Sequence, residues 1–345
     1  MRALLFSAFG GPLTVESVPD PEPSPGGVVV RVGATGVCRS DWHGWQGHDP
    51  DIGLPHVPGH ELAGTIEAVG RDVRRWQVGD RVTVPFVCAC GTCEVCRAGE
   101  HQVCPSQTQP GFTHWGSFAE LVALEAADVN LVRLPPAMSF STAASLGCRY
   151  ATAYRAVVQV GRVRAGEWVV VHGCGGVGLS AVQVAVAYGA QVVAVDVSPD
   201  ALSMAQSFGA AALVDASSVE VVPAVLSATG GGAALSLDAL GSPQTCADSI
   251  LGLAPRGRHV QVGLLPDGAT PVPMDRVIGR ELEVLGSHGM SASAYPELLS
   301  LVADGRLRPD LLVTREIGLD DAGAALRDVG AVAGICVITS FSSEP

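Results

Sequence analysis

The chain has 345 residues, of which 48% are hydrophobic and only 16% charged, and its net charge is −13. This composition excludes an intrinsically disordered chain, which would have too few apolar residues to form a core, and the length suggests about two domains. The acidic balance and the lack of a basic run argue against a nucleic-acid-binding surface.

The most apolar segment, residues 169–195, is long enough to cross a bilayer, which takes about 20 apolar residues. Glycines interrupt it at Gly173, Gly175, Gly176, Gly178 and Gly189. Short valine-rich runs beside glycines are typical of buried parallel strands. The sequence therefore predicts no membrane span. The N-terminal residues also lack a signal-peptide pattern, so we expect a cytoplasmic protein.

The predicted elements change character near residue 150. Before it, strand-forming runs at 28–37 and 61–70 end at glycines or turn signals and predict a β-rich region. After it, predicted strands at 168–173, 191–197, 234–240 and 259–265 follow one another, with helices at 177–189 and 198–209. This alternation is typical of an α/β fold with a doubly wound parallel sheet. A helix at 320–330 and a strand at 334–340 are predicted near the end.

A glycine-rich loop lies between the strand at 168–173 and the following helix, with the pattern G-x-G-G-V-G at Gly173, Gly175, Gly176 and Gly178. Such a loop lets the backbone and a helix N-terminus approach a pyrophosphate. Asp196 ends the next strand, where a carboxylate binds a ribose 2′-hydroxyl and repels a 2′-phosphate. No Lys or Arg occurs between Arg164 and Arg256, so the sequence favours NAD over NADP. The alternatives are a turn without a ligand and, for Asp196, a simple cap.

Four of the ten cysteines fall at short, regular spacing, at Cys90, Cys93, Cys96 and Cys104. In a reducing compartment this spacing favours one tetrahedral zinc ion with four thiolate ligands over disulfides or a redox site. A closed thiolate shell leaves no position for water, so the predicted zinc is structural and holds a lobe at about 88–105. Cys88 is left out because Gly91 forms the turn between Cys90 and Cys93.

Three further segments, GVCRSDWH, PGHELAG and LGCRYATAY, hold scattered Cys and His residues. Together with the cysteine lobe and the glycine loop in this order, they give a chain that resembles the zinc-dependent medium-chain alcohol dehydrogenases over almost its whole length. The resemblance implies a β-rich GroES-like catalytic domain at 1–149 that is completed by 287–345. A Rossmann domain at 150–286 would lie between these two parts.

The resemblance assigns a second, catalytic zinc ion to Cys38, His60 and Cys148, which leave one coordination position open. Related polyol dehydrogenases commonly have an acidic residue in place of Cys148. Glu61 matches an occasional alternative ligand, and Asp41 matches the acceptor for the second ring N–H of His60. The alternative for both carboxylates is an ordinary surface or capping role.

Ser40 and His43 match the proton relay of this family. In the mechanism that the resemblance implies, zinc lowers the pKa of the bound alcohol, and the relay carries the released proton to solvent. The resulting zinc alkoxide then gives up hydride to the nicotinamide ring. A helix N-cap for Ser40 and a surface histidine for His43 remain as alternatives.

The other matched positions would line the cofactor and the substrate. Arg39 matches a residue that contacts the pyrophosphate, and Thr152, Val177 and Val262 match positions beside the nicotinamide. Phe86 and Trp115 match walls of the substrate pocket, although plain core positions are nearly as common for aromatic residues. One departure is Ile335, which stands where family members often carry an arginine near the pyrophosphate and Glu61.

The predicted function is therefore reversible, NAD-linked oxidation of an alcohol to an aldehyde or ketone, with two zinc ions per chain. One alternative is a polyol or thiol-adduct formaldehyde dehydrogenase on the same scaffold. Another is a zinc- and NAD-binding sensor without turnover. The resemblance also implies a homo-oligomer, either a tetramer or a dimer.

Overall fold

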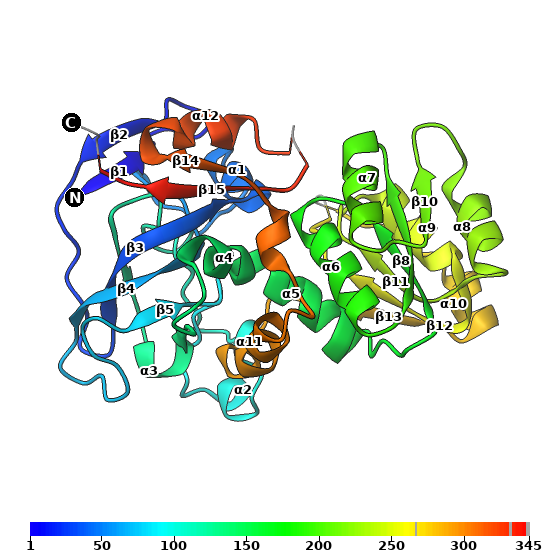
Figure 1. Ribbon diagram of the computed structural model, residues 1–345, viewed down its shortest axis with the longest axis horizontal. Helices are drawn as coiled ribbons and strands as arrows, with labels where there is room; N and C mark the ends of the chain where they lie inside the picture. The colour runs from blue at the N-terminus through cyan, green and yellow to red at the C-terminus, as the bar shows by residue number, and fades with distance from the viewer. Residues whose placement is uncertain (266–267, 331–332, 343–345) are drawn as a thin grey trace.

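The computed structural model describes residues 1–265, 268–330 and 333–342. Two lobes lie side by side along the long axis of the molecule (Figure 1). One lobe is built on a seven-stranded, mostly antiparallel sheet, and the other on a six-stranded parallel sheet. The mixed α/β class and the parallel sheet predicted from the sequence are confirmed.

The seven-stranded sheet has the order β14-β15-β3-β4-β5-β7, with β6 also paired to β3. Most of β3 is buried, including the valines at 28, 29, 30 and 32, and Arg31 is its one exposed residue, so this strand lies in the interior of the lobe. The strands predicted at 28–37 and 61–70 are confirmed as β3 and β4. The strands of this lobe are β1 (Arg2–Leu5), β2 (Thr14–Ser17), β3 (Val28–Val37), β4 (Glu61–Val69), β5 (Arg81–Thr83), β6 (Leu121–Leu124), β7 (Val132–Arg133), β14 (Val313–Gly318) and β15 (Ile335–Ser340).

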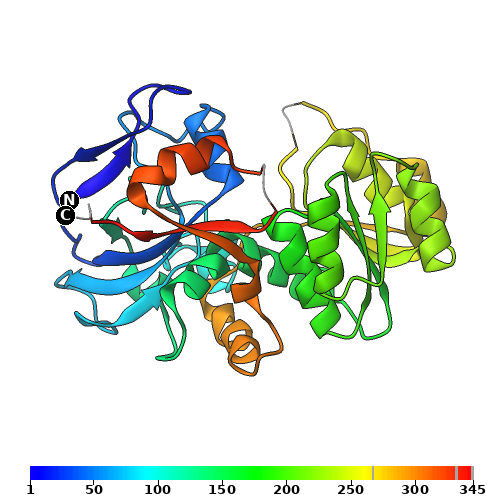
Figure 2. The same cartoon turned by 45° about the horizontal axis from the view of Figure 1, so that its top comes forward.

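The last strand returns the chain to its N-terminal lobe. β15 pairs in parallel with β14 and antiparallel with β3, and it runs back toward the start of the chain (Figure 2), where Arg2 donates from Nη1 to the carbonyl of Phe341 at 2.7 Å. The predicted terminal strand is thus confirmed. The helix predicted at 320–330 is shorter than expected, because a 3-10 turn (η6, Leu319–Asp321) precedes α12 (Ala322–Arg327) and Gly330 turns the chain with a φ of +91°.

The six-stranded sheet has the order β10-β9-β8-β11-β12-β13. The chain first adds strands on one side of β8 and then crosses over to add β11, β12 and β13 on the other side, while all strands stay parallel. This is the strand order of a dinucleotide-binding fold, in which ligands bind at the crossover point. The strand predicted at 259–265 is wrong in its bounds, because the amides of Val262 and Gly263 turn to the carbonyl of Asp238. The strands are β8 (Trp168–His172), β9 (Gln191–Asp196), β10 (Ala212–Asp215), β11 (Ala233–Asp238), β12 (Leu253–Gln261) and β13 (Glu283–Gly286).

Helices cover both faces of this sheet (Figure 1). α6 (Gly176–Ala187) and α7 (Pro199–Ser207) pack on one face; α8 (Val221–Thr229), α9 (Pro243–Leu251) and α10 (Met274–Arg280) pack on the other. Ser198 caps α7 by accepting a hydrogen bond from the amide of Ala201, and a proline follows at the first helical position, as the sequence predicts. Among the described residues, we find no helix that is both long and apolar enough to cross a bilayer.

A continuous helical segment connects the two lobes. It runs through α4 (Phe140–Ser145), η2 (Leu146–Tyr150), α5 (Ala151–Tyr154) and η3 (Arg155–Val160), and η2 and η3 are wide π-type turns. Such turns within helices often occur at functional sites. The other helical elements are α1 (Arg39–Trp45), α2 (Glu94–Arg97), η1 (His101–Val103), α3 (Ala127–Asn130), η4 (Ala292–Ala294), α11 (Tyr295–Ala303) and η5 (Pro309–Leu312).

Candidate metal centres and dinucleotide loop

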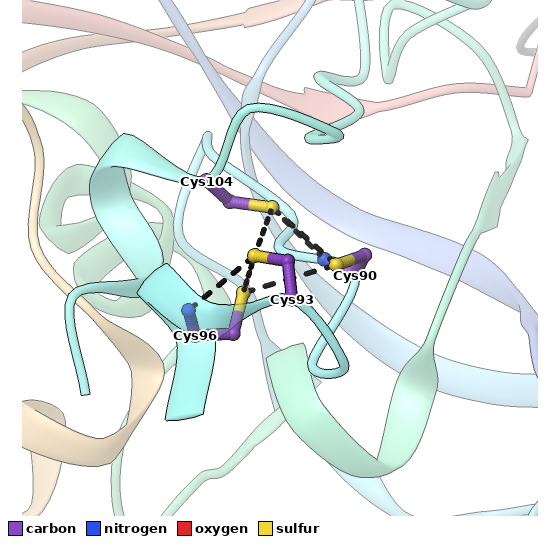
Figure 3. A group of neighbouring side chains, drawn as sticks. All are labelled: Cys90, Cys93, Cys96 and Cys104. Atoms are coloured by element: carbon purple, nitrogen blue, oxygen red, sulfur yellow. Dashed lines mark hydrogen bonds between the residues drawn. The ribbon is translucent and has the colours of Figure 1, made fainter. Parts of the chain in front are cut away.

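The four predicted cysteines of the lobe converge on one point (Figure 3). Their Sγ atoms lie 3.4 Å apart for Cys93–Cys96, 3.6 Å for Cys104–Cys90, and 3.9 Å for both Cys90–Cys96 and Cys93–Cys104. A tetrahedron of sulfurs about 2.3 Å from a zinc ion has edges of about 3.8 Å, so the four side chains fit that metal. Hydrogen bonds from Thr92 lower the pKa of Cys90 to about 5, which favours a thiolate there.

Cys88 lies outside this cluster. Its buried thiol contacts the carbonyl oxygen of Pro85 at 3.8 Å, and burial raises its pKa to about 12. The ligand atoms that converge in the lobe are those of Cys90, Cys93, Cys96 and Cys104, without that of Cys88. The geometry therefore agrees with leaving Cys88 out of the ligand set.

A second group of ligand atoms comes from three separate elements. Cys38 follows β3, His60 and Glu61 lie at the start of β4, and Cys148 lies in η2. One ligand atom from each of the four residues lies within 4.8 Å of the others. Pairing of β3 with β4 places Gly36 opposite Glu61 and so brings the first two segments together. The structure thus assembles the residues that were scattered in the sequence.

His60 is fixed in orientation by Asp41. Its Nδ1 lies 2.8 Å from Oδ1 of Asp41, which also accepts a hydrogen bond from the amide of Gly59, and both side chains are fully buried. Burial lowers the pKa of His60, but the charge and hydrogen bond of Asp41 outweigh burial and raise it well above its usual value. The other ring nitrogen, Nε2, is buried without a hydrogen-bond partner. A metal ion would satisfy this nitrogen.

Cys38 is arranged to carry a negative charge. A hydrogen bond from the Cys148 thiol holds the pKa of Cys38 well below its usual value, although burial opposes the shift. The positive charges of Arg149 and His60 act in the same direction. A buried thiolate and an imidazole that gives up its Nε2 proton when a metal binds form a suitable donor pair for zinc.

Arg149, which the sequence analysis missed, is the partner of Glu61. Its Nε donates to Oε1 at 2.9 Å and its Nη2 to Oε2 at 2.5 Å, while its backbone N donates to Oε1 at 3.1 Å. Burial raises the pKa of Glu61 to about 7, and the charge of Arg149 opposes that rise. Ile335 is fully buried at the start of β15, so the guanidinium beside Glu61 comes from another position. In the sequence, Arg149 could have been noticed as the single charged residue within the apolar run LGCRYATAY.

Helix α1 carries the residues assigned to the proton relay. The Cys38 thiol lies 3.8 Å from Oγ of Ser40, and Nδ1 of His43 lies 2.9 Å from Nδ1 of His48. Burial, together with the charges of His48 and Arg39, lowers the pKa of His43. His48 was also missed, although a histidine five residues after His43 is visible in the sequence. Arg39 is exposed and places its guanidinium 5.1 Å from the ring centroid of Trp42.

The predicted glycine loop connects β8 with α6. Gly173 has a φ of +87°, and a side chain on Gly178 would collide with the carbonyl oxygen of Gly173. Gly175 is the N-cap of α6, and Gly176 is its first residue. A Cβ at Gly176 would also collide with the side chain of Arg149, so the loop lies directly against the residue that binds Glu61. The loop and the second ligand group are therefore neighbours.

Asp196 closes the glycine loop from the end of β9. Its Oδ2 accepts a hydrogen bond from the amide of Cys174 at 2.6 Å, and its Oδ1 accepts one from the amide of Ser198 at 2.8 Å. The carboxylate thus has the capping role that the sequence left open. It also lies at the carboxyl edge of the sheet, where a ribose binds in this fold.

The residues matched to the nicotinamide surroundings lie near the junction of the lobes. Thr152 in α5 is buried, and its Oγ1 has no hydrogen-bond partner, which fits a position beside a polar ligand group. Val177 and Val262 are partly buried against one core cluster. Their contact with a cofactor stays a prediction.

Two phenylalanine rings flank His60. The ring centroid of Phe86 lies 6.2 Å from that of His60, and the ring centroid of Phe112 lies 5.2 Å from it. Phe112 was not singled out in the sequence. Trp115 donates from Nε1 to the carbonyl of Pro55 at 2.9 Å and packs on the core of the N-terminal lobe, so its pocket role stays a prediction.

Comparison with known proteins agrees with this arrangement. Residues 24–136 match the model of the alcohol dehydrogenase GroES-like domain, and residues 176–304 match that of zinc-binding dehydrogenases. An alcohol dehydrogenase of Rhizobium meliloti (strain 1021) is 37% identical, with 89% of each chain covered. An NAD-dependent alcohol dehydrogenase of Sulfurisphaera tokodaii is 34% identical, covering 94% of this chain and 95% of that one.

A solved structure extends the likeness to the whole fold. The alcohol dehydrogenase TADH from Thermus sp. ATN1 superposes with a TM-score of 0.92 at 32% identity, covering 99% of this chain and 100% of that one. The fold, the two matched domains and the relatives all agree with the resemblance seen in the sequence. The chain belongs to the zinc-dependent medium-chain alcohol dehydrogenase family and is an oxidoreductase of that zinc-binding type.

Proposed function

We propose that this alcohol dehydrogenase oxidises its alcohol reversibly to an aldehyde or ketone with NAD as the hydride acceptor. The observation that carries the proposal is the group of Cys38, His60 and Cys148, whose ligand atoms converge beside an unpartnered imidazole nitrogen. Arg149 connects this group to the glycine loop through Gly176. A metal centre and a dinucleotide site in contact with each other are what hydride transfer requires.

Each of the two cysteine-containing groups would hold one zinc ion. Cys38, His60 and Cys148 would hold the catalytic ion, with Glu61 within reach as an alternative ligand. Cys90, Cys93, Cys96 and Cys104 would hold the structural ion. Zinc in the catalytic site supplies Lewis-acid polarisation of the substrate oxygen.

The protein side chains then position ligands and move protons. Asp41 holds the ring of His60 so that Nε2 stays turned to the metal position. Ser40 and His43 carry the alcohol proton away, and the lowered pKa of His43 favours a neutral ring that can accept it. Phe86 supplies an apolar wall next to His60.

NAD is the cofactor that the loop surroundings favour. The carboxylate of Asp196 repels a 2′-phosphate, and no cationic side chain occurs between Arg164 and Arg256 to receive one. The likeness to a relative named NAD-dependent alcohol dehydrogenase supports the same choice.

We also propose that residues 1–149 with 287–345 and residues 150–286 form the two domains, and that the chain forms a homotetramer or a dimer. β13 is an edge strand of the parallel sheet, and Val284 on it and Ile278 in α10 are 44% and 74% exposed. A second copy would cover such an edge.

The free cysteines fit a reducing compartment such as the cytoplasm.

The test is His60→Ala, with metal content and activity measured together. We expect turnover of simple alcohols with NAD to fall by about a thousandfold or more, because zinc loses a ligand in the catalytic site, while the lobe keeps its zinc. His101→Ala, outside both ligand groups, is the matched control. Full activity of His60→Ala would contradict the site. A panel of primary alcohols, secondary alcohols, polyols and thiol adducts identifies the substrate class.

A further inference from the structure

We propose that His48 is the residue that takes the proton from His43 and delivers it to water. This inference rests on the proposed function, since it extends the path beyond His43. The observation behind it is the direct contact between the two imidazole rings, whose Nδ1 atoms lie 2.9 Å apart.

The contact constrains the protons on both rings. Two Nδ1 atoms form a hydrogen bond only when one carries a proton and the other does not. Nδ1 of His43 is therefore engaged with His48, and its Nε2 remains to exchange a proton on the other side of the ring. A neutral imidazole with both nitrogens engaged in this way can pass a proton through itself.

The two rings are held together by the surrounding structure. The backbone N of His48 donates to the carbonyl of His43 at 3.0 Å, and Gly47 with a φ of +80° turns the chain back after α1. The ring of Trp42 stands edge-on to both, with centroids 5.0 Å from His43 and 5.9 Å from His48. His43 is half-buried and His48 is exposed, so the pair runs from a partly shielded ring to one that is open to solvent.

One proton passes through the pair of rings in each turnover. His43 accepts a proton at Nε2 and releases the one on Nδ1 to Nδ1 of His48. His48 then releases its Nε2 proton to water, so that one proton has left and both rings are neutral. Exchange with water between turnovers restores the starting tautomers.

The charged groups around the pair come from three places. Arg39 on α1 lowers the pKa of His43, whereas Cys38 before α1 raises it. α12, which packs against α1, ends at Arg327 and is followed by Asp328. Asp49 and Asp51 follow His48 in its own loop.

The experiment compares His48→Gln with Asp51→Asn, a charge-removing control in the same loop. We expect His48→Gln to lower kcat by about three- to tenfold near neutral pH, a modest part of what a full proton-transfer residue contributes. We expect the pH profile of kcat to change and added imidazole to restore the rate. His43→Gln with and without His48→Gln should have the same kcat, because His48 acts only through His43.

Three results would overturn the inference: an unchanged pH profile in His48→Gln, no response to imidazole, or a double variant markedly slower than His43→Gln. A second arm needs no activity, because NMR of the wild-type protein should show a proton shared between the two Nδ1 atoms that is lost in His48→Gln. Absence of that proton in the wild type would also overturn it. A wild type that shares this proton but oxidises no alcohol would count against the proposed function alone.

Discussion

The guanidinium of Arg149 donates to both carboxylate oxygens of Glu61, and the backbone N of Arg149 donates to one of them as well. This contact ties the start of β4 to the helical segment that carries Cys148. Arg149 also donates to the carbonyl of Val37, the last residue of β3. All the elements that supply the second ligand group therefore meet at one buried ion pair.

Replacing Arg149 by methionine should destabilise the protein strongly. A buried carboxylate that loses its partner costs about 3–5 kcal/mol. Thermal or denaturant unfolding of the zinc-loaded protein measures this cost. The double variant Arg149→Met/Glu61→Gln should recover much of it, because no unpaired charge is left. A single variant as stable as the wild type would show that the pair contributes little.

In the cysteine lobe, Cys93→Ser and Cys88→Ser should differ in metal content. We expect Cys93→Ser to lose one zinc ion per chain, because the closed thiolate shell is opened. Cys88→Ser should keep all its zinc, since the Cys88 thiol lies outside the cluster. Elemental analysis of the purified proteins gives both counts. Loss of zinc from Cys88→Ser would mean that the ligand set is wrong.

Asp196→Gly should relax the preference for NAD. Removing the carboxylate removes its repulsion of a 2′-phosphate, and we expect the ratio of kcat/KM for NAD over NADP to fall by about tenfold or more. The variant also loses the hydrogen bonds that the backbone amides of Cys174 and Ser198 donate to Asp196, so its thermal stability should be followed in parallel. A wild-type enzyme that prefers NADP would contradict our interpretation of Asp196.

His172 should make the protein sensitive to mild acid. Burial lowers the pKa of His172 to about 4, and the neighbouring charges are those of Asp238 and His259. The pKa of His172 in the unfolded chain is near 6.5. Above pH 6.5 its neutral ring therefore costs the folded protein no stability, and the free energy of unfolding decreases as the pH falls from 6.5 toward 4. The loss amounts to about 3 kcal/mol.

Unfolding curves of wild type and His172→Leu at several pH values between 4.5 and 7.5 test this expectation. The variant should lose less stability over this range than the wild type. If the free energy of unfolding changed equally with pH in the two proteins, His172 would not be the source of the acid sensitivity.

The sequence by itself determined the elements and motifs that depend on local chemistry. The turn between β8 and α6, the cap at Ser198 and the cluster of the four lobe cysteines depend on short segments, and the structure contains each of them, while their binding of NAD and zinc stays a prediction. The alternation of valine-rich runs with helices was enough to predict a parallel sheet. The resemblance to a family then connected Cys38, His60 and Cys148, which no local pattern joins.

Only the tertiary structure decided which distant side chains meet. Arg149 is adjacent to Cys148 in sequence, but its partner Glu61 lies 88 positions away, and strand pairing and the wide helical turn bring them together. The contact of His43 with His48 likewise depends on how the chain turns after α1. Periodicity and spacing carry no information on such pairs, because they arise from packing between elements.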